Sequence, residues 1–209
     1  MSARAAGPWE RVREGDGIVV QRRHIDGGTL DELRGNGAID APLAAVMAVL
    51  QDSDRGAEWM FECAEHMMLE RIGPDTEIVY HRSKLPWPLA DRDAVLRGTR
   101  IFDPRQVRFV FETVSYSARP PVDGVVRMAL IRGQWVLTPT DGNRSTLVEY
   151  QLSTDPGGAL PRWLVNRFAR TTPYEAIRRL RMQVARRLYP DVERQLAEQP
   201  EYRAIVGTR

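Results

Sequence analysis

The sequence predicts an α+β protein of the helix-grip type, in which a curved antiparallel sheet wraps a long C-terminal helix. Three observations predict it: two strand-like segments followed by two short helical segments, then six strand-like segments, then one long amphipathic helix. A sheet with one apolar face needs a cover, and the final helix carries an apolar stripe that suits this position. A strongly bent sheet and one helix leave room for a ligand-sized internal cavity.

Length and composition indicate one ordinary globular domain. The chain has 209 residues, of which 43% are hydrophobic and 28% charged, which is enough for one sizeable core. We find no repeat and no long linker, so we expect a single domain over residues 1–190. The charged tail over residues 191–209 is predicted to be either a short helix near residues 192–196 or a mobile segment.

The charge and targeting features favour a cytoplasmic bacterial protein that is monomeric and binds no nucleic acid. The net charge is only +2, and Lys84 is the only lysine. Cys63 is the only cysteine, so no intrachain disulfide can form. Residues 1–8 lack the apolar segment of a signal peptide, and no stretch approaches the roughly 20 apolar residues of a membrane-spanning helix.

The elements before the main run of strands follow from apolar spacing and turn residues. Trp9 is the expected anchor of the first of them, and Gly35 and Gly37 weaken the third. In order, the predicted elements are a short helix or arm over residues 7–14, strands over 18–25 and 30–39, and helices over 43–50 and 55–61.

Six further strands are predicted in the middle of the chain, and hairpin-like turns between them favour an antiparallel meander. Val107, Phe109 and Phe111 alternate with Arg108 and Val110, as expected for a strand with one face in the core. The predicted strands cover residues 66–72, 77–84, 92–102, 107–117, 124–137 and 145–154.

The final helix is predicted to run from Pro161 to near Tyr189. Apolar residues recur at steps of three and four along it, which places them on one face. Thr171-Thr172-Pro173 interrupts this stripe. Two interpretations stay open: a simple proline kink, or a weak point at which the helix opens to admit a ligand.

The sequence carries no recognisable catalytic, metal or cofactor motif. It has no Gly-rich phosphate loop, no His-Glu-x-x-His and no cysteine pair for zinc, so we expect no metal and no cofactor. His24, His66 and His81 are scattered over predicted strands, and we interpret them as structural. Cys63 lies next to Glu62 rather than a cation, which favours an inert thiol.

A proline-rich corner at residues 85–93 stands out between two predicted strands. Two prolines flank Trp87, which stiffens the chain. Asp91 and Asp93 flank Arg92, a pattern that suits a turn held by charge-assisted hydrogen bonds. The structural interpretation is a corner, and the alternative places Asp91 at the wall or mouth of a cavity.

This corner resembles that of StAR-related lipid-transfer (START) domains. Trp59 also resembles a tryptophan of that family, and the resemblance extends in the right order over residues 9–189. It rests on Ile78 to Asp93, on Pro120-Pro121 with Gly124 to Arg127, on Gly133, Trp135, Leu137 and Pro139, on Tyr150, and on Asp155 to Asn166 with its Asp-Pro-Gly-Gly turn.

The resemblance implies a START/Bet v 1-like helix-grip fold whose tunnel holds one lipid or similar apolar molecule. It implies head-group contacts at Glu70 and Asp91. A cavity-facing arginine of some relatives is Gly98 here, and Arg100 shares that face of the strand. The resemblance further implies a ligand contact at Tyr150, apolar wall from Leu164 and Phe168, and a hydroxyl from Thr171 or Thr172.

These features predict a module that binds a lipid or other hydrophobic molecule for transport, sequestration or sensing, with transient membrane contact. An acidic pair favours hydroxyl, amide or amine head groups, whereas Arg100 favours phosphate or carboxylate. Two alternatives are an enzyme similar to polyketide aromatase/cyclases, using the same cavity, and a ligand-regulated interaction module. The scarcity of histidine disfavours the enzyme.

Overall fold

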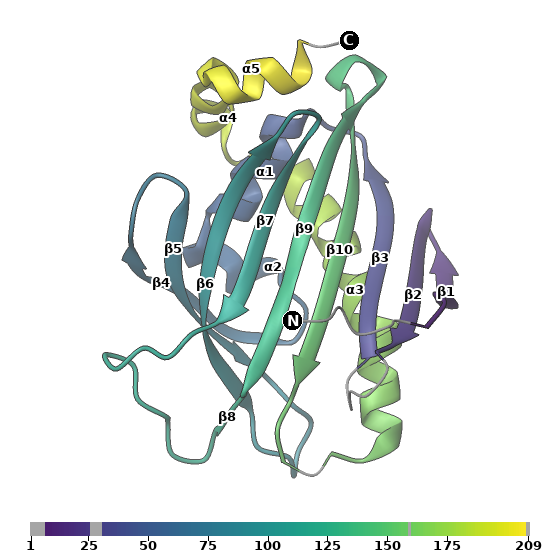
Figure 1. Ribbon diagram of the computed structural model, residues 1–209, viewed down its shortest axis with the longest axis vertical. Coiled ribbons are helices and arrows are strands. Elements are labelled where there is room, and N and C mark those ends of the chain that lie inside the picture. The colour runs from purple at the N-terminus through teal and green to yellow at the C-terminus, as the bar shows by residue number, and fades with distance from the viewer. Residues whose placement is uncertain (1–6, 26–30, 159, 208–209) are drawn as a thin grey trace.

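One large antiparallel sheet, with a long helix lying along it, makes up most of the molecule (Figure 1). The structure is a computed structural model that describes residues 7–25, 31–158 and 160–207. Within these residues ten strands form a single sheet, and the long helix is α3 (Arg162–Ala185). The predicted α+β helix-grip class is therefore confirmed.

The strands and helices have these bounds. The strands are β1 (Glu10–Gly15), β2 (Ile18–His24), β3 (Asp31–Ile39), β4 (Cys63–Arg71), β5 (Thr76–Ser83), β6 (Arg92–Asp103), β7 (Gln106–Thr113), β8 (Val126–Arg127), β9 (Leu130–Thr140) and β10 (Ser145–Asp155). The other helices are α1 (Leu43–Gln51), α2 (Gly56–Trp59), α4 (Pro190–Glu198) and α5 (Pro200–Val206), with short 3-10 helices at Ser53–Arg55 and Asp141–Asn143.

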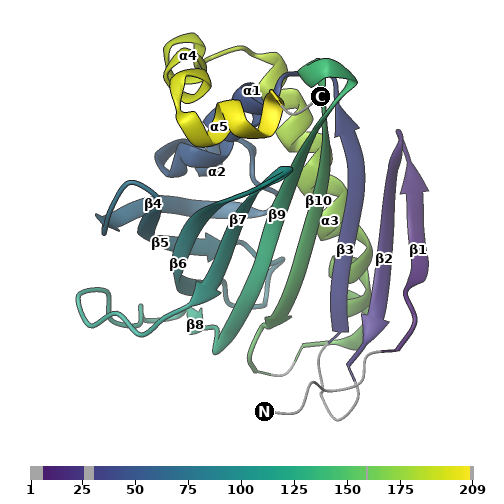
Figure 2. The same cartoon turned by 45° about the horizontal axis from the view of Figure 1, so that its top comes forward.

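The sheet order is β1-β2-β3-β10-β9-β7-β6-β5-β4, with β8 beside β6. Neighbouring strands are antiparallel, except that β8 runs parallel to β6. The chain meanders through β4, β5, β6 and β7, as the hairpin-like turns predict. The helices α1 and α2 connect β3 to β4, which lies at the far edge of the sheet (Figure 2). The N-terminal strands join the C-terminal ones because β3 pairs with β10.

The helix α3 packs most closely on the sheet where β3 carries two glycines. A Cβ at Gly35 would lie 3.0 Å from both Ile177 Cδ1 and Pro173 Cβ, and one at Gly37 would lie 3.1 Å from Ile177 Cγ2. Ile177 and Leu180 are fully buried there. The two glycines that weaken the predicted strand therefore allow the backbone of α3 to approach it.

The helices α1, α4 and α5 cover one end of the sheet (Figures 1 and 2). Leu196, Tyr202 and Ile205 of the C-terminal segment are buried in the same apolar core as α1. The amide of Asn143 donates a hydrogen bond of 3.0 Å to the hydroxyl of Tyr202. Residues 192–196 are helical, as one of the two interpretations of the tail predicts, and the segment packs onto the core.

Two of the predicted elements are wrong in type or continuity. Of the two alternatives for residues 7–14, a short helix or an arm, the helix is wrong, because residues 10–15 pair with β2 as strand β1. Trp9 does act as an anchor, since Arg23 and Arg34 lie over its ring at 4.5 and 4.2 Å. The strand predicted over residues 124–137 is split into β8 and β9, which pair with different strands.

Two predicted boundaries also need correction. The strand predicted to end at residue 117 ends at Thr113. The final helix ends at Ala185 rather than near Tyr189, because Arg187 adopts a positive φ of 50° that stops the right-handed helix. Leu188 keeps the apolar spacing of the helix without being part of it. The turn predicted at residues 26–28 and the first residue of the second predicted strand, Leu30, lie outside the described residues.

Candidate functional site: an internal cavity

A cavity of about 600 Å³ lies between the sheet and α3. Alternate residues of β5, namely Glu77, Val79, His81 and Ser83, line one wall, as expected for one face of a strand. Residues of β3, β4, β6, β7, β9, β10, α1, α2 and α3 also contribute to the lining, together with residues of the connecting segments. The volume is within the range of pockets that enclose small organic ligands.

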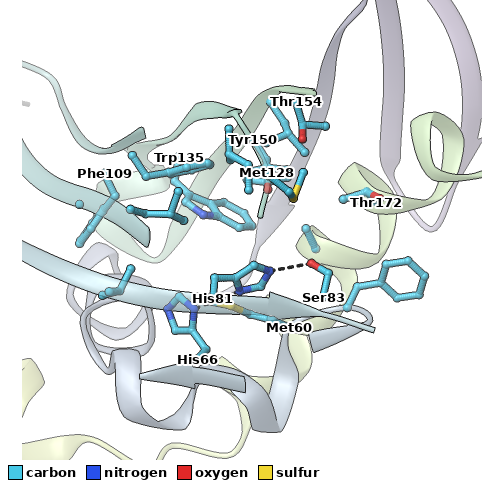
Figure 3. Close-up of a pocket in the computed structure, with 18 of the residues that line it drawn as sticks. Met60, His66, His81, Ser83, Phe109, Met128, Trp135, Tyr150, Thr154 and Thr172 are labelled. Atoms are coloured by element: carbon cyan, nitrogen blue, oxygen red, sulfur yellow. Dashed lines mark hydrogen bonds between the residues drawn. The ribbon is translucent and has the colours of Figure 1, made fainter. Parts of the chain in front are cut away.

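Aromatic side chains form the apolar wall on the central strands (Figure 3). Trp135 and Tyr150 lie directly opposite each other on β9 and β10, with ring centroids 4.2 Å apart. Phe111 stacks on Tyr150 at 6.2 Å. Burial raises the pKa of Tyr150 above its usual value, so this phenol stays neutral. The predicted contact residue Tyr150 therefore belongs to the cavity wall.

The helix α3 contributes a stripe of small and apolar side chains to the cavity. The predicted residue Phe168 lies in this stripe, and Thr172 rather than Thr171 provides its hydroxyl. The third predicted residue of this helix, Leu164, is fully buried but does not line the cavity. The helix continues through Pro173 without a break in its helical assignment. The stripe consists of Val165, Phe168, Ala169, Thr172 and Ala176.

Arg100 reaches the cavity from β6 and is held by two partners. Its guanidinium donates hydrogen bonds to Asp75 Oδ1 at 2.7 Å and to Gln51 Oε1 at 2.6 Å. The Arg100 side chain is only 9% exposed, whereas Asp75 is 40% exposed. Gly98 lines the cavity on the same strand and Arg97 is exposed, which agrees with the alternation predicted for this strand.

Glu70 lies outside the cavity because of a bulge in β4. The register of β4 against β5 shifts between Met68 and Glu70, so the alternation of side chains changes by one residue. His66 and Arg71 consequently line the cavity, while Glu70 is exposed and accepts a hydrogen bond of 3.0 Å from the hydroxyl of Tyr116. The implied head-group position at Glu70 is therefore not part of the cavity that the structure describes.

Asp91 holds the corner rather than the cavity wall. It accepts hydrogen bonds from Arg82 Nε at 2.9 Å and from the backbone N–H of Leu85 at 3.2 Å. Two residues on, Asp93 is buried against Arg127 at 2.7 Å and the hydroxyl of Tyr80 at 3.1 Å. Burial alone would raise the pKa of Asp93, but these hydrogen bonds hold it below its usual value. The corner is thus held by charge-assisted hydrogen bonds.

A polar cluster on β4 and β5 lines the cavity and was not predicted. His66 and His81 face each other across the two strands, with their Nδ1 atoms 3.2 Å apart. His81 Nε2 lies 3.0 Å from Ser83 Oγ (Figure 3). Cys63 Sγ lies 3.8 Å from His81 Nδ1. Unbroken counting outward from the turn at residues 73–75 would pair His81 with Met67, so the bulge between Met68 and Glu70 is what brings His66 opposite His81.

Burial determines the protonation states in this cluster. It lowers the pKa of His66 to about 3, with a further contribution from His81, and lowers that of His81 to about 4. Both imidazoles are therefore neutral at neutral pH. Burial also raises the pKa of the Cys63 thiol to about 11, so the thiol is protonated, in agreement with its interpretation as inert.

Among the described residues, no group of three or more His, Cys, Asp or Glu could hold a metal ion. None of the helices that these residues form is long and apolar enough to cross a membrane.

A curved sheet, a helix along it and a largely apolar cavity between them define a helix-grip protein. The chain belongs to the START domain family, whose sequence model matches residues 1–188. It is 30% identical over 181 residues to an uncharacterized protein of Pseudomonas aeruginosa, covering 86% of this chain and 88% of that protein. These findings confirm the resemblance inferred from the corner and the Asp-Pro-Gly-Gly turn.

Two further relatives carry descriptive names. The chain is 26% identical over 163 residues to phosphatidylcholine transfer protein of Mus musculus, covering 76% of this chain and 75% of that protein. A crystal structure of a STAR-related lipid transfer protein fragment from Xanthomonas axonopodis superposes with a TM-score of 0.77 at 29% identity. It covers 85% of this chain and 98% of that fragment.

Proposed function

We propose that this protein binds one lipid or similar hydrophobic molecule in the internal cavity, with α3 as its cover, for transport, sequestration or sensing. The observation that carries the proposal is the largely apolar cavity of about 600 Å³ between α3 and the sheet. Membership of the START domain family supports a hydrophobic-ligand function in general. The names of the transfer proteins that it resembles favour carriage over catalysis.

The size of the cavity sets the scale of the ligand. At about 30 Å³ for each water-sized group, the volume of about 600 Å³ holds about 20 such groups. Each CH₂ moved from water into the apolar cavity contributes about 0.8 kcal/mol. An apolar chain or ring system of this size supplies affinity without specificity, so the polar wall residues decide which head group is accepted.

Three of the predicted contact residues, Arg100, Tyr150 and Phe168, are our candidates for direct ligand contact, since all line the cavity. Thr172 replaces Thr171 as the candidate hydroxyl of the helix. Asp91 does not line the cavity, so it would affect ligand binding indirectly, by holding the corner at residues 85–93.

The enzyme alternative has one observation in its favour. His81 Nε2 lies 3.0 Å from Ser83 Oγ inside the cavity, which is the distance of a base and a hydroxyl that exchange a proton. Burial lowers the pKa of His81 to about 4, which makes it a weak general base at neutral pH. Binding without covalent change is therefore the stronger proposal.

Native mass spectrometry with solvent extraction, on protein purified from its own host, tests the proposal. We expect a noncovalent adduct whose extracted mass identifies an apolar molecule, unchanged after incubation with the protein. Gly98→Phe should abolish the adduct, because the phenylalanine ring would occupy the cavity. The strand tolerates a side chain at this position, since the atom nearest to a Cβ at Gly98 is 3.6 Å away. Arg97→Phe, on the exposed side of the same strand, is the matched control.

The binding proposal fails if no adduct is found and neither fluorescent fatty-acid nor sterol probes bind. A bound molecule that changes mass during incubation would favour the enzyme. An adduct that persists in Gly98→Phe would place the ligand outside this cavity.

A further inference from the structure

The cluster of His66, His81 and Ser83 offers hydrogen bonds to the cavity without offering charge. Burial keeps both histidines neutral at neutral pH, so each ring has one donor and one acceptor nitrogen. Among the described residues, the hydroxyl of Ser83 forms one hydrogen bond, with His81 Nε2. Ser83 therefore retains hydrogen-bonding capacity toward a ligand.

Two tautomer patterns satisfy the contacts in this cluster. In the first, His66 donates to His81 through Nδ1, His81 donates to Ser83 through Nε2, and the Ser83 hydroxyl donates into the cavity. In the second, every bond is reversed and Ser83 Oγ accepts from the cavity. The cluster can therefore pair with a hydroxyl group, which donates and accepts, or with a carbonyl group, which only accepts.

The charged side chains of the cavity wall are largely committed to other protein groups. Arg100 is paired with Asp75, Arg71 with Glu77 at 3.3 Å, and Glu62 with Arg167 at 3.6 Å. Arg92 donates to the backbone oxygens of Ala90, Pro156 and Gly157. Asp31 and Asp155 also have partners. Of the charged wall residues that the structure describes, Lys84 has no recorded partner, and it is exposed.

An anionic head group would have to displace one of these pairs, or reach the exposed Lys84, to be neutralised. Removing Asp75 from Arg100 leaves a carboxylate to be rehydrated, and burying an anion near neutral histidines gives it no compensating charge. The Arg100 pair and the histidine cluster are also separate. Asp75 lies beside the first residue of β5, Thr76, and His81 is five residues along that strand, roughly 16 Å at about 3.3 Å per residue.

From this arrangement we infer that His66, His81 and Ser83 form a subsite for an uncharged hydroxyl or carbonyl group. The cavity then selects neutral amphiphiles over phosphate- or carboxylate-bearing lipids with the same chain. This inference rests on the proposed function, because it requires the apolar part of the ligand to occupy the cavity. It narrows the ligand class to uncharged molecules of about 20 non-hydrogen atoms at about 30 Å³ each.

Competition against the neutral fluorescent dye Nile red tests the inference. Four competitors share one saturated C16 chain and differ in head group: cetyl alcohol, monopalmitoylglycerol, palmitate and hexadecyl phosphate. At neutral pH we expect the two neutral molecules to displace the dye at concentrations at least about tenfold lower than the two charged ones. Ser83→Ala and His81→Gln should each weaken the binding of cetyl alcohol about three- to tenfold, which is the effect of one hydrogen bond. The affinity for palmitate should stay unchanged.

Ser115→Ala is the control, because Ser115 is exposed and does not line the cavity. Thermal unfolding of each variant checks that the fold survives. Equal or tighter binding of palmitate or hexadecyl phosphate would overturn the subsite while leaving the cavity function intact. So would an affinity for cetyl alcohol that is unchanged in both Ser83→Ala and His81→Gln. If neither Nile red nor any competitor binds, the proposed function itself fails, and the subsite with it.

Discussion

At Leu69 in β4, one extra residue decides which side chains reach the cavity. His66 faces inward, and strict alternation would bring Glu70 inward as well. The bulge between Met68 and Glu70 brings Arg71 inward instead, where it pairs with Glu77. On the cavity side of β4, Arg71 is neutralised by Glu77 and His66 is uncharged. The carboxylate of Glu70 that the resemblance implied is absent from this side.

The two cavity histidines predict a specific pH dependence of stability. Their pKa values fall from 6.5 in the unfolded chain to about 3 and about 4 in the folded protein. Between these values the unfolded state binds more protons, so the free energy of unfolding decreases as the pH falls from 6.5 toward 4. The expected slope is up to about 1.4 kcal/mol per pH unit for each histidine. Urea unfolding at a series of pH values measures it.

Matched variants separate the cavity histidines from the rest of the chain. His81→Gln should flatten the slope in this pH range, because glutamine takes up no proton on unfolding. His24→Gln is the control, since the side chain of His24 is 60% exposed and lies outside the cavity wall. If wild type and His81→Gln lose stability in parallel, burial does not hold His81 neutral in the folded state.

At the scale of elements, α3 has two unequal halves. From Tyr174 to Val184 the helix places Ile177, Leu180 and Val184 into the core and approaches β3 at Gly35. Before Pro173, Trp163 and Val165 are exposed, and the buried residues are Leu164 and Ala169. Pro173 has no N–H to donate to the carbonyl of Ala169. These facts favour opening of the first half over movement of the whole helix.

Hydrogen exchange of the backbone amides tests this asymmetry. We expect amides of residues 163–170 to exchange faster than those of residues 174–184, because local opening needs less buried surface to be exposed. Saturation with Nile red should slow exchange in residues 163–170, because Val165, Phe168 and Ala169 of this segment line the occupied cavity. Uniform exchange along α3 without ligand would contradict a weak point at Thr171 to Pro173. So would Nile red slowing exchange in residues 174–184 alone.

The elements themselves were largely predictable, and their exceptions have local causes. Alternation located the strands from β4 to β10, and apolar spacing located α1 and α3, because each element buries one face. Strand β1 lacks such a pattern and depends on pairing with β2. The split of β8 from β9 depends on contacts with β6 that sequence spacing does not encode. The bulge in β4 likewise left Glu70 on the wrong face in our prediction.

The candidate site was predictable in part. The positions of Arg100, Tyr150 and Phe168 follow from strand and helix periodicity together with the family resemblance. The pairing of His66 with His81 depends on the bulge in β4, because unbroken register from the turn between β4 and β5 would place Met67 opposite His81. The partners of Arg100, Asp75 and Gln51, come from separate segments, so composition and spacing gave no indication that its charge is already compensated.

At the scale of the whole molecule, two exposed tryptophans lie near the same end of the cavity. Trp87 is 92% exposed on the turn between β5 and β6, and Trp163 is 62% exposed in the first turn of α3. Arg92 joins these regions through the backbone oxygens of Pro156 and Gly157, and both Leu85 and Leu160 line the cavity there. Tryptophan favours the boundary between water and lipid, so this end is our candidate for transient membrane contact.

Transfer of Nile red from the protein to phosphatidylcholine vesicles tests this surface. Trp87→Ala should slow transfer at least about tenfold, because burying an aromatic side chain in the membrane boundary contributes about 1.5–3 kcal/mol to docking. The affinity for Nile red in solution should stay unchanged, since Trp87 does not line the cavity. Leu147→Ala is the control, because Leu147 is an exposed apolar side chain on β10, 49% accessible and away from this end. Equal transfer rates in Trp87→Ala and Leu147→Ala would mean that the ligand leaves through water, and the tryptophan end would then have no docking role.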